Sequence, residues 1–197
     1  MPKETGTHNS SDNPKYFNVK FFDLLLAQFG GAEGELPMAI AYLTQATTEI
    51  HPARKAALVR IAREKIKHAD TLGSMLLQMA HKRSGPLSAQ IKRSELNELL
   101  VNKDVKDDHL KRASTLLKNF MSAEHPQPTE RHYAADPTIY LAANIATEER
   151  QIAAYEQLAG LTTNSHFLSA LNFAKARQIL HREEFLDLLS RVTTSRH

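Results

Sequence analysis

Hydrophobic and polar residues repeat along this chain with the period of an α-helix, and no stretch shows the sustained alternation of a β-strand. Pairs such as Gly30-Gly31 and His51-Pro52 separate the periodic segments from one another. The pattern predicts helices at residues 17–29, 32–48, 53–81, 137–158 and 164–192.

Two of the predicted helices have a clear apolar pattern. Leu36, Ile40 and Leu43 fall on one face of the second helix. The third helix repeats its apolar residues at helical spacing, at Leu58, Ile61, Ile66, Met75 and Met79. Such patterns are typical of amphipathic helices that pack on a core.

Three further segments differ from the long helices. Residues 1–16 are polar, and we expect them to form a disordered arm before a single domain at residues 17–197. Residues 87–122 read as short, highly charged helical pieces, which we expect to carry the chain across the molecule. Residues 124–136 hold two prolines and predict a loop.

Two long helical hairpins separated by such an excursion favour an all-α fold. The arrangement predicts a ferritin-like four-helix bundle with a helical crossover excursion. An unrelated helical bundle is the alternative.

Composition excludes several classes of protein. With 42% hydrophobic and 24% charged residues over 197 positions, the chain is typical of one globular domain. It has no Cys, which excludes disulfides and thiolate sites and weakly favours the cytoplasm, as does an N-terminus unlike a secretion signal. No apolar run is long enough for a membrane span. The net charge is +3, and the basic residues are scattered among acidic ones, so we expect no nucleic-acid partner.

Two residue pairs on different predicted helices suggest a site inside the bundle. Lys65 and His68 form one pair, Gln178 and His181 the other, and the spacing of three puts each pair on one helix face. Ferritin-like di-metal sites use a Glu-x-x-His pair on each of two helices and a lone Glu on each of the others. Glu35 and Glu148 could be those lone acids. From periodicity alone, a buried site and solvated helix faces remain equally open.

The wider sequence around these residues resembles the manganese catalase family, including its short spore-coat relatives. The segments FFDLLLAQFGGAEGELPMAIAYLTQA and EKIKHADTLGSMLLQM resemble the family's first hairpin, and residues 140–189 resemble its second. Residues 87–136 do not follow the family pattern.

The resemblance implies roles for individual residues. Glu35, His68, Glu148 and His181 would be metal ligands, for manganese or iron. Tyr42 matches a tyrosine beside the metals, although a half-buried core aromatic is an equal alternative. The family's bridging carboxylate would fall at position 65, which is Lys, and its acid/base glutamate at position 178, which is Gln.

These two departures weaken the expected chemistry. Glu35, Glu148 and a charged Lys65 sum to minus one, which does not balance two divalent ions but fits no metal, or one ion if Lys65 is neutral or moves away. Gln178 cannot carry a proton at neutral pH. Glu64, four residues before His68, could be a substitute ligand, but we expect it beside the site rather than in it.

Two functions therefore remain open. The first is a catalase-like enzyme of weakened activity, which acts on hydrogen peroxide or dioxygen with one or two metal ions. The second is a metal-poor or mono-metal bundle with a structural or assembly role. The family resemblance also implies a homo-oligomer, for which a hexamer is the expectation.

Overall fold

The computed structural model describes residues 18–80 and 129–194. These residues hold no strand, and their helices are α1 (Val19–Gly30), α2 (Glu35–Thr48), α3 (Pro52–Ala80), η1 (Glu130–Tyr133), α6 (Pro137–Ala159) and α7 (Ser165–Thr194). The five long helices lie within a few residues of the predicted ones. The expected arm at residues 1–16 and the charged excursion at 87–122 lie outside the described residues.

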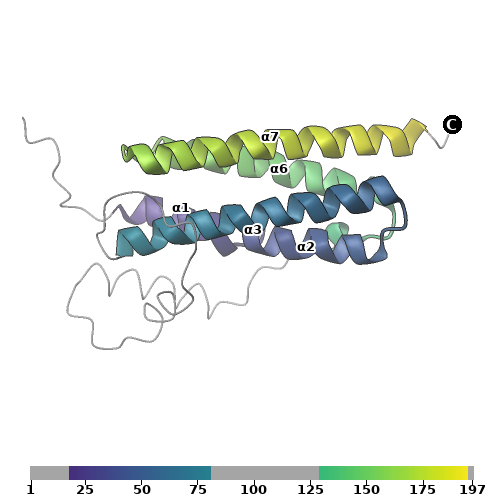
Figure 1. The fold of residues 1–197 in the computed structure, drawn as a ribbon, viewed down its shortest axis with the longest axis horizontal. Helices are drawn as coiled ribbons and strands as arrows, with labels where there is room; N and C mark the ends of the chain where they lie inside the picture. The colour runs from purple at the N-terminus through teal and green to yellow at the C-terminus, as the bar shows by residue number, and fades with distance from the viewer. Residues whose placement is uncertain (1–17, 81–128, 195–197) are drawn as a thin grey trace, which may run out of the picture.

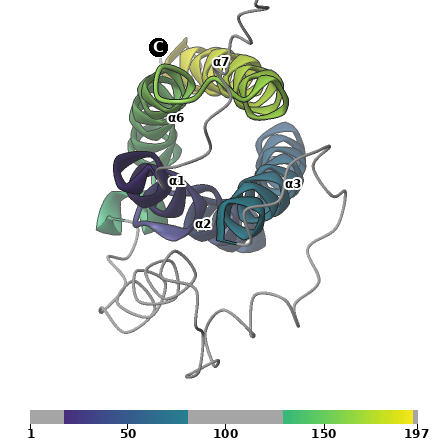
Figure 2. The ribbon, with the colours of Figure 1, turned by 90° about the vertical axis from the view of Figure 1, so that its left-hand side faces the viewer.

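The helices α2, α3, α6 and α7 form a four-helix bundle. Helices α2 and α3 pack as one antiparallel hairpin, and α6 and α7 as a second one beside it (Figure 1). Seen from the end, the four helices enclose a common centre, and the shorter α1 lies against one end of the bundle (Figure 2). The ferritin-like all-α architecture is confirmed.

Local sequence signals set the helix boundaries. The side chain of Asn18 caps α1 by accepting a hydrogen bond from the backbone N–H of Phe21 at 3.0 Å. Asp136 does the same for α6 at the N–H of Thr138, at 2.8 Å. The turn between α1 and α2 requires a glycine, because a Cβ on Gly31 would lie 2.5 Å from a backbone oxygen of α1.

The inward faces of α3 and α7 follow heptad spacing, as expected for left-handed bundles. In α7 the buried residues are Phe167, Leu171, Ala174, Gln178, His181, Phe185 and Leu188. In α3 the same spacing connects Leu58, Ile61, Lys65, His68, Leu72 and Met75, all of them buried. Polar residues therefore occupy the middle of two stripes that are apolar at both ends.

This interruption divides the core into two apolar clusters. One cluster surrounds Phe22, Met75 and Leu171 near α1, and the other surrounds Met38, Ile61 and Phe185 at the opposite end. A layer of polar side chains lies between them, at the level where all four helices contribute.

A second buried polar network attaches η1 to the bundle. Gln45 and Asn144 exchange two hydrogen bonds, of 2.8 and 3.0 Å, and Gln45 also donates to the backbone oxygen of His132. The ring of His132 contacts the hydroxyls of Thr129 and Thr147 at 3.0 and 3.1 Å. Residues 129–136, part of the predicted loop, thus contain a short 3₁₀ helix with fixed contacts.

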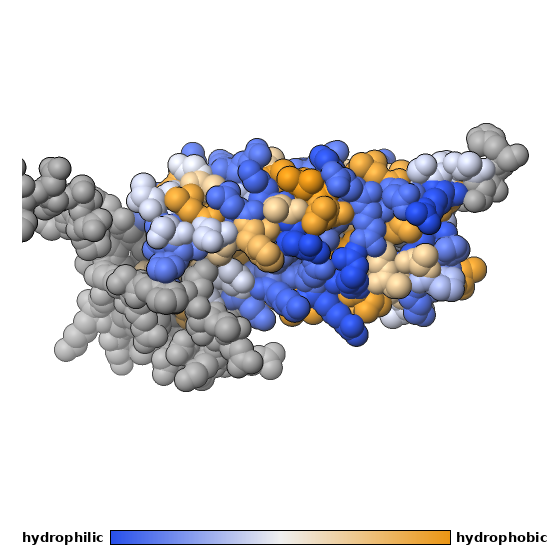
Figure 3. All heavy atoms as spheres, turned by 45° about the horizontal axis from the view of Figure 1, so that its top comes forward, coloured by the Kyte–Doolittle hydropathy of each residue, from blue (hydrophilic) through white to orange (hydrophobic). Residues whose placement is uncertain are grey.

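Several apolar positions face outward instead of into the core. Leu36, Ile40 and Leu43 are 40, 57 and 38% exposed, so they do not lie on the buried face of α2, which instead packs Met38 and Tyr42 into the core. Ile66 in α3 is also exposed, at 39%. The face of the molecule that carries α7 is mixed, with hydrophobic residues scattered among hydrophilic ones (Figure 3). In the described parts of the chain, none of the helices has the length and apolar character needed to cross a membrane.

Candidate functional site

The polar layer at the centre of the bundle brings together the site residues that the sequence predicts. Each of the four bundle helices contributes, and every side chain in the layer is buried. The members are Glu35 and Tyr42 from α2, Lys65 and His68 from α3, Glu148, Gln151 and Tyr155 from α6, and Gln178 and His181 from α7.

Lys65 lies at the centre of this layer. Its Nζ is 2.9 and 3.1 Å from the two oxygens of Glu148, and 3.5 Å from the nearer oxygen of Glu35. The side-chain oxygens of Gln151 and Gln178 accept from the same ammonium at 2.5 and 2.9 Å. The side chain has no exposed surface, so these oxygens replace its entire hydration shell.

Glu35 accepts hydrogen bonds from several elements. The hydroxyl of Tyr155 and Nε2 of Gln178 both donate to its Oε1 at 2.5 Å. Burial alone would raise the pKa of Glu35, but the charge of Lys65 and the hydrogen bonds of His68 and Tyr155 outweigh it and lower the pKa to about 2. Glu35 is therefore a carboxylate at neutral pH.

Glu148 is also kept ionised, but by different neighbours. Tyr42 donates its hydroxyl to Oε1 of Glu148 at 2.6 Å. Burial opposes ionisation, yet Lys65 and His181 lower the pKa of Glu148 below its usual value. Burial and the charge of Glu148 raise the pKa of Tyr42 well above its usual value, so Tyr42 stays a neutral donor.

The two histidines face each other across the layer, with ring centroids 6.1 Å apart. Nδ1 of His68 is 3.4 Å from Glu35, and Nδ1 of His181 is 3.6 Å from Glu148. The opposite nitrogen of His181, Nε2, lies 2.9 Å from Glu64. Both nitrogens of His181 therefore face carboxylate oxygens.

Glu64 lies at the edge of the layer, beside the site and not in it. Arg177 binds it through two hydrogen bonds of 2.8 and 2.9 Å, and Arg60 adds a third at 3.1 Å. Burial raises the pKa of Glu64, but the hydrogen bonds from His181 and Arg177 lower it to about 2. The carboxylate thus fixes the His181 ring from outside the bundle centre.

Gln151 and Tyr155 belong to the layer but were missed in the sequence. Gln151 bridges Lys65 to the backbone oxygen of Glu33, which its Nε2 contacts at 2.5 Å. Their positions, three and seven residues after Glu148, place both on the same helix face as that glutamate. This spacing is the signal that could have found them.

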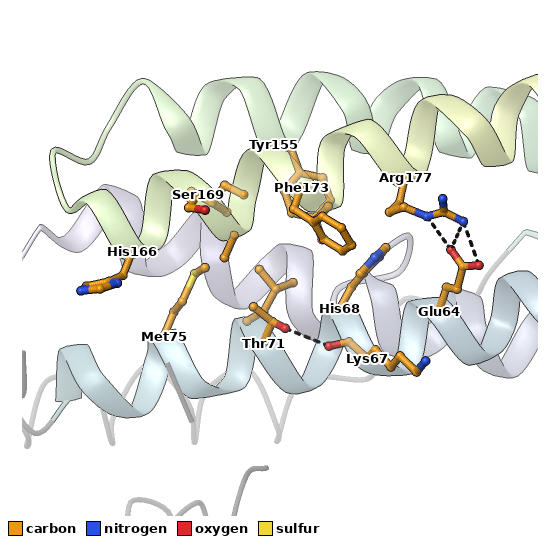
Figure 4. Close-up of a pocket in the computed structure, with 14 residues that line it drawn as sticks. Glu64, Lys67, His68, Thr71, Met75, Tyr155, His166, Ser169, Phe173 and Arg177 are labelled. Atoms are coloured by element: carbon orange, nitrogen blue, oxygen red, sulfur yellow. Dashed lines mark hydrogen bonds and ion pairs between the residues drawn. The ribbon is translucent and has the colours of Figure 1, made fainter. Parts of the chain in front are cut away.

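A cavity of about 620 Å³ lies between α3 and α7 and reaches the layer at His68 (Figure 4). Its walls are largely apolar, with Leu72, Met75 and Phe173 among them. The ion pair of Glu64 with Arg177 bounds the end of the cavity near the layer, as Figure 4 shows. Two residues of the layer, His68 and Tyr155, therefore line this cavity.

Comparison with known proteins identifies the family. The model of the family described as "Manganese containing catalase" matches residues 9–197. The chain belongs to this family. It is 27% identical to Protein CotJC of Bacillus subtilis (strain 168) over 161 residues, which span 82% of this chain and 78% of that protein.

Solved structures of KatB, a manganese catalase from Anabaena, share the fold. For wild-type KatB the TM-score is 0.66 at 24% identity, with 98% of this chain and 80% of that chain covered. A second structure, of KatB from Anabaena PCC7120, gives the same values. At this identity the likeness concerns the architecture of the bundle.

Family membership implies manganese, but the layer does not fit a pair of metal ions. In residues 18–80 and 129–194, no three His, Asp or Glu side chains are arranged as a metal site. The space between Glu35 and Glu148 is taken by the Lys65 ammonium, which contacts both oxygens of Glu148 and one oxygen of Glu35 and would repel a metal cation. With both histidines neutral, the layer carries one net negative charge, too little for two divalent ions.

Proposed function

We propose that this chain is a metal-poor member of the manganese containing catalase family that serves as a structural subunit of a protein assembly. The observation that carries the proposal is the fully buried Lys65 ammonium between Glu35 and Glu148. In this interpretation a side-chain cation does permanently what bound metal ions would do, which is to compensate the buried carboxylates.

Electrostatics favours this arrangement over metal binding. A buried carboxylate is costly unless a cation and hydrogen-bond donors compensate it. Lys65 supplies the cation for both glutamates, while Tyr42, Tyr155 and Gln178 supply neutral donors. Metal entry would require the contacts of Lys65 to break first.

The same layer is poorly suited to peroxide decomposition. Disproportionation of hydrogen peroxide requires a group that takes up and returns protons near the substrate. Gln178 lies where the resemblance implies such a glutamate, and an amide does not exchange protons at neutral pH. Glu35 and Glu148 have lowered pKa values and remain ionised. We therefore expect slow catalase activity or none.

The geometry also favours a second candidate function. Two histidines and two glutamates still converge on one layer, with His68 near Glu35 and His181 near Glu148. If the Lys65 side chain moved away, they could hold one manganese or iron ion, and the protein would act weakly on hydrogen peroxide or dioxygen.

The outer surface of α2 supports a role in assembly. Leu36, Ile40 and Leu43 form an exposed apolar face on one helix, which contact with another subunit would bury. The proposed assembly is a homo-oligomer, with a hexamer as the expected form. The absence of Cys is compatible with the proposed cytoplasmic location.

Metal content separates the two candidates. The full chain, produced in medium supplemented with manganese and iron, is measured by elemental analysis together with oxygen evolution from peroxide and its mass in solution. We expect an oligomer with less than one metal ion per chain and little oxygen evolution. Two tightly bound manganese ions per chain and rapid oxygen evolution would refute the proposal. A monomer would refute its assembly part.

A further inference from the structure

We propose that the cavity between α3 and α7 binds an amphipathic anion, namely an aliphatic carboxylate with an unbranched chain of medium length. Its volume of about 620 Å³ is within the range of protein sites that enclose small organic molecules. Such a ligand goes beyond the proposed function and does not depend on it, because its binding requires no particular state of the polar layer.

The cavity is elongated along the two helices. It runs from Glu64 to Met75 on α3 and from Arg177 back to His166 on α7, as the labelled residues of Figure 4 show. Each of these two stretches is about 16 Å long, at a helical rise of about 1.5 Å per residue. The extended chain of dodecanoate has a similar length, so the shape of the cavity favours an alkyl chain.

Small side chains of α7 leave this space open. Ala170 and Ala174 line the cavity one helical turn apart, and Leu72, Met75 and Leu171 give it apolar walls. An apolar space of this size destabilises a fold if it stays empty, and it holds ordered water poorly, because buried water needs several polar partners. An apolar ligand chain therefore suits the walls better than water does.

The polar groups along the middle of the cavity already have partners. Tyr155 donates its hydroxyl to Glu35 at 2.5 Å, so the polar end of this side chain is bound within the layer. Thr71 donates its hydroxyl to the backbone oxygen of Lys67 at 3.0 Å. The aromatic ring of Phe173 also lines the cavity and is 65% exposed, so a ligand chain would cover it.

One end of the cavity is positively charged. Lys67 and Arg177 lie there with Glu64, which is the one acidic lining residue in the described part of the chain. Glu64 accepts hydrogen bonds from Nε and Nη2 of Arg177, so these two charges offset each other. Lys67 is exposed and forms no ion pair with another described residue. A carboxylate at this end would contact the Lys67 ammonium while its chain lies along the apolar walls.

A fluorescent reporter at the cavity tests binding directly, because the chain has no Trp. Phe173→Trp places the reporter on the cavity wall, and Leu186→Trp is the matched control, at a position of α7 that is 45% exposed and does not line the cavity. Both full-length chains are titrated with dodecanoate below the concentration at which it forms micelles. We expect a saturable shift of emission to shorter wavelength for Phe173→Trp and none for Leu186→Trp.

The charge and the chain of the ligand are tested separately on the Phe173→Trp protein. Dodecanol has the chain without the charge and should bind about fivefold more weakly than dodecanoate, whereas butyrate has the charge without the long chain and should not bind measurably. Lys67→Gln should weaken dodecanoate binding about fivefold. Lys55→Gln, at an exposed position of the same helix outside the cavity, should leave it unchanged.

A larger side chain in the cavity should block the ligand. Ala174→Leu should abolish the emission shift, whereas Ala176→Leu, at an exposed position of α7, should not. Circular dichroism checks that both variants keep the wild-type helix content, and Lys67→Gln provides an independent surface variant.

Several results would overturn the inference. They are no shift with dodecanoate, equal shifts at both reporter positions, and undiminished binding in a folded Ala174→Leu chain. Equal binding of dodecanol and dodecanoate would overturn the assignment of a carboxylate. Emission of Phe173→Trp at short wavelength before any ligand is added would show that another part of the protein or a second copy covers the cavity, which would also overturn it.

Discussion

The ammonium of Lys65 and the side-chain oxygen of Gln178 are direct hydrogen-bond partners, 2.9 Å apart. These are the two site positions at which, by the family resemblance, a glutamate would be expected instead. Glu at position 178 would add a third buried carboxylate to the layer. Gln supplies an uncharged acceptor for Lys65 and a donor for Glu35 instead. Gln178 therefore stabilises the buried Lys65 ammonium without adding a further negative charge to the layer.

Removal of Lys65 should destabilise the bundle strongly. Lys65→Ala leaves Glu35 and Glu148 buried without a cation, and loss of one partner of a buried ion pair costs about 3 kcal/mol or more. Denaturant unfolding measures the loss. Lys67→Ala is the matched control, because Lys67 is exposed on the same helix, and it should change the free energy of unfolding by about 0.5 kcal/mol at most. Equal effects of the two changes would contradict the central role of Lys65.

The sequence predicted the helices well because their boundaries depend on local signals. Asn18, Asp136 and the glycines before α2 act through neighbouring backbone groups, and such contacts can be inferred from a few residues. The order and length of the segments then favoured two hairpins, as the structure shows.

The hydrophobic pattern alone did not predict which residues are buried at the site and on α2. In α3 the pattern placed Ile66 among the apolar positions, yet Ile66 is exposed and its neighbour Lys65 is fully buried. Lys65 is stable there because of oxygens from three other helices, which no local pattern contains. The apolar residues of α2 could be identified in the sequence, but a single sequence does not distinguish a helix face in the core from a face that contacts another molecule.

Removal of one hydroxyl group should show how much a neutral hydrogen-bond donor contributes to the stability of the fold. Tyr155→Phe removes the hydrogen bond to Glu35 and leaves that carboxylate with fewer donors, which should cost about 2 kcal/mol. Tyr133→Phe is the control, since Tyr133 is 45% exposed and should show little change. Thermal and urea unfolding of the three proteins provide the comparison. A Tyr155→Phe chain as stable as the wild type would mean that Glu35 needs no such donor.

The protein should become less stable in acid, because a carboxylate outside the site, Glu49, becomes protonated. Glu49 accepts from Arg54 at 2.8 Å, from the backbone of His51 at 2.7 Å and from the hydroxyl of Tyr140. Burial would raise its pKa, but these hydrogen bonds lower it from 4.5 to about 2. Because the pKa is lower in the folded state, this stabilisation is complete above pH 4.5 and disappears as the pH falls toward 2.

The variant Glu49→Gln separates this effect from the acid response of the whole chain. At neutral pH it should lower the free energy of unfolding by about 2 kcal/mol, and the difference from the wild type should shrink in acid. Glu156→Gln, at a position 60% exposed, should show no such pH-dependent difference. Urea titrations across the acid range test both expectations; a constant gap between Glu49→Gln and the wild type would exclude the linkage.

Restoring both carboxylates should restore metal binding. The double change Lys65→Glu with Gln178→Glu removes the central cation and adds two negative charges, so the layer changes from minus one to minus four, which balances two divalent ions. Metal content should rise toward two ions per chain. Catalase activity should rise with it, by about 10² to 10⁴ for a recovered general base.

The single changes show whether both positions are needed. Lys65→Glu alone should admit metal but leave proton transfer slow, whereas Gln178→Glu alone should leave Lys65 in place and bind little metal. Elemental analysis and oxygen evolution from peroxide, measured on all four proteins, distinguish these cases. If the double variant folds with the wild-type helix content but gains neither metal nor activity, charge at these two positions is not what limits metal binding. In that case, residues other than Lys65 and Gln178 would also prevent metal binding in the bundle.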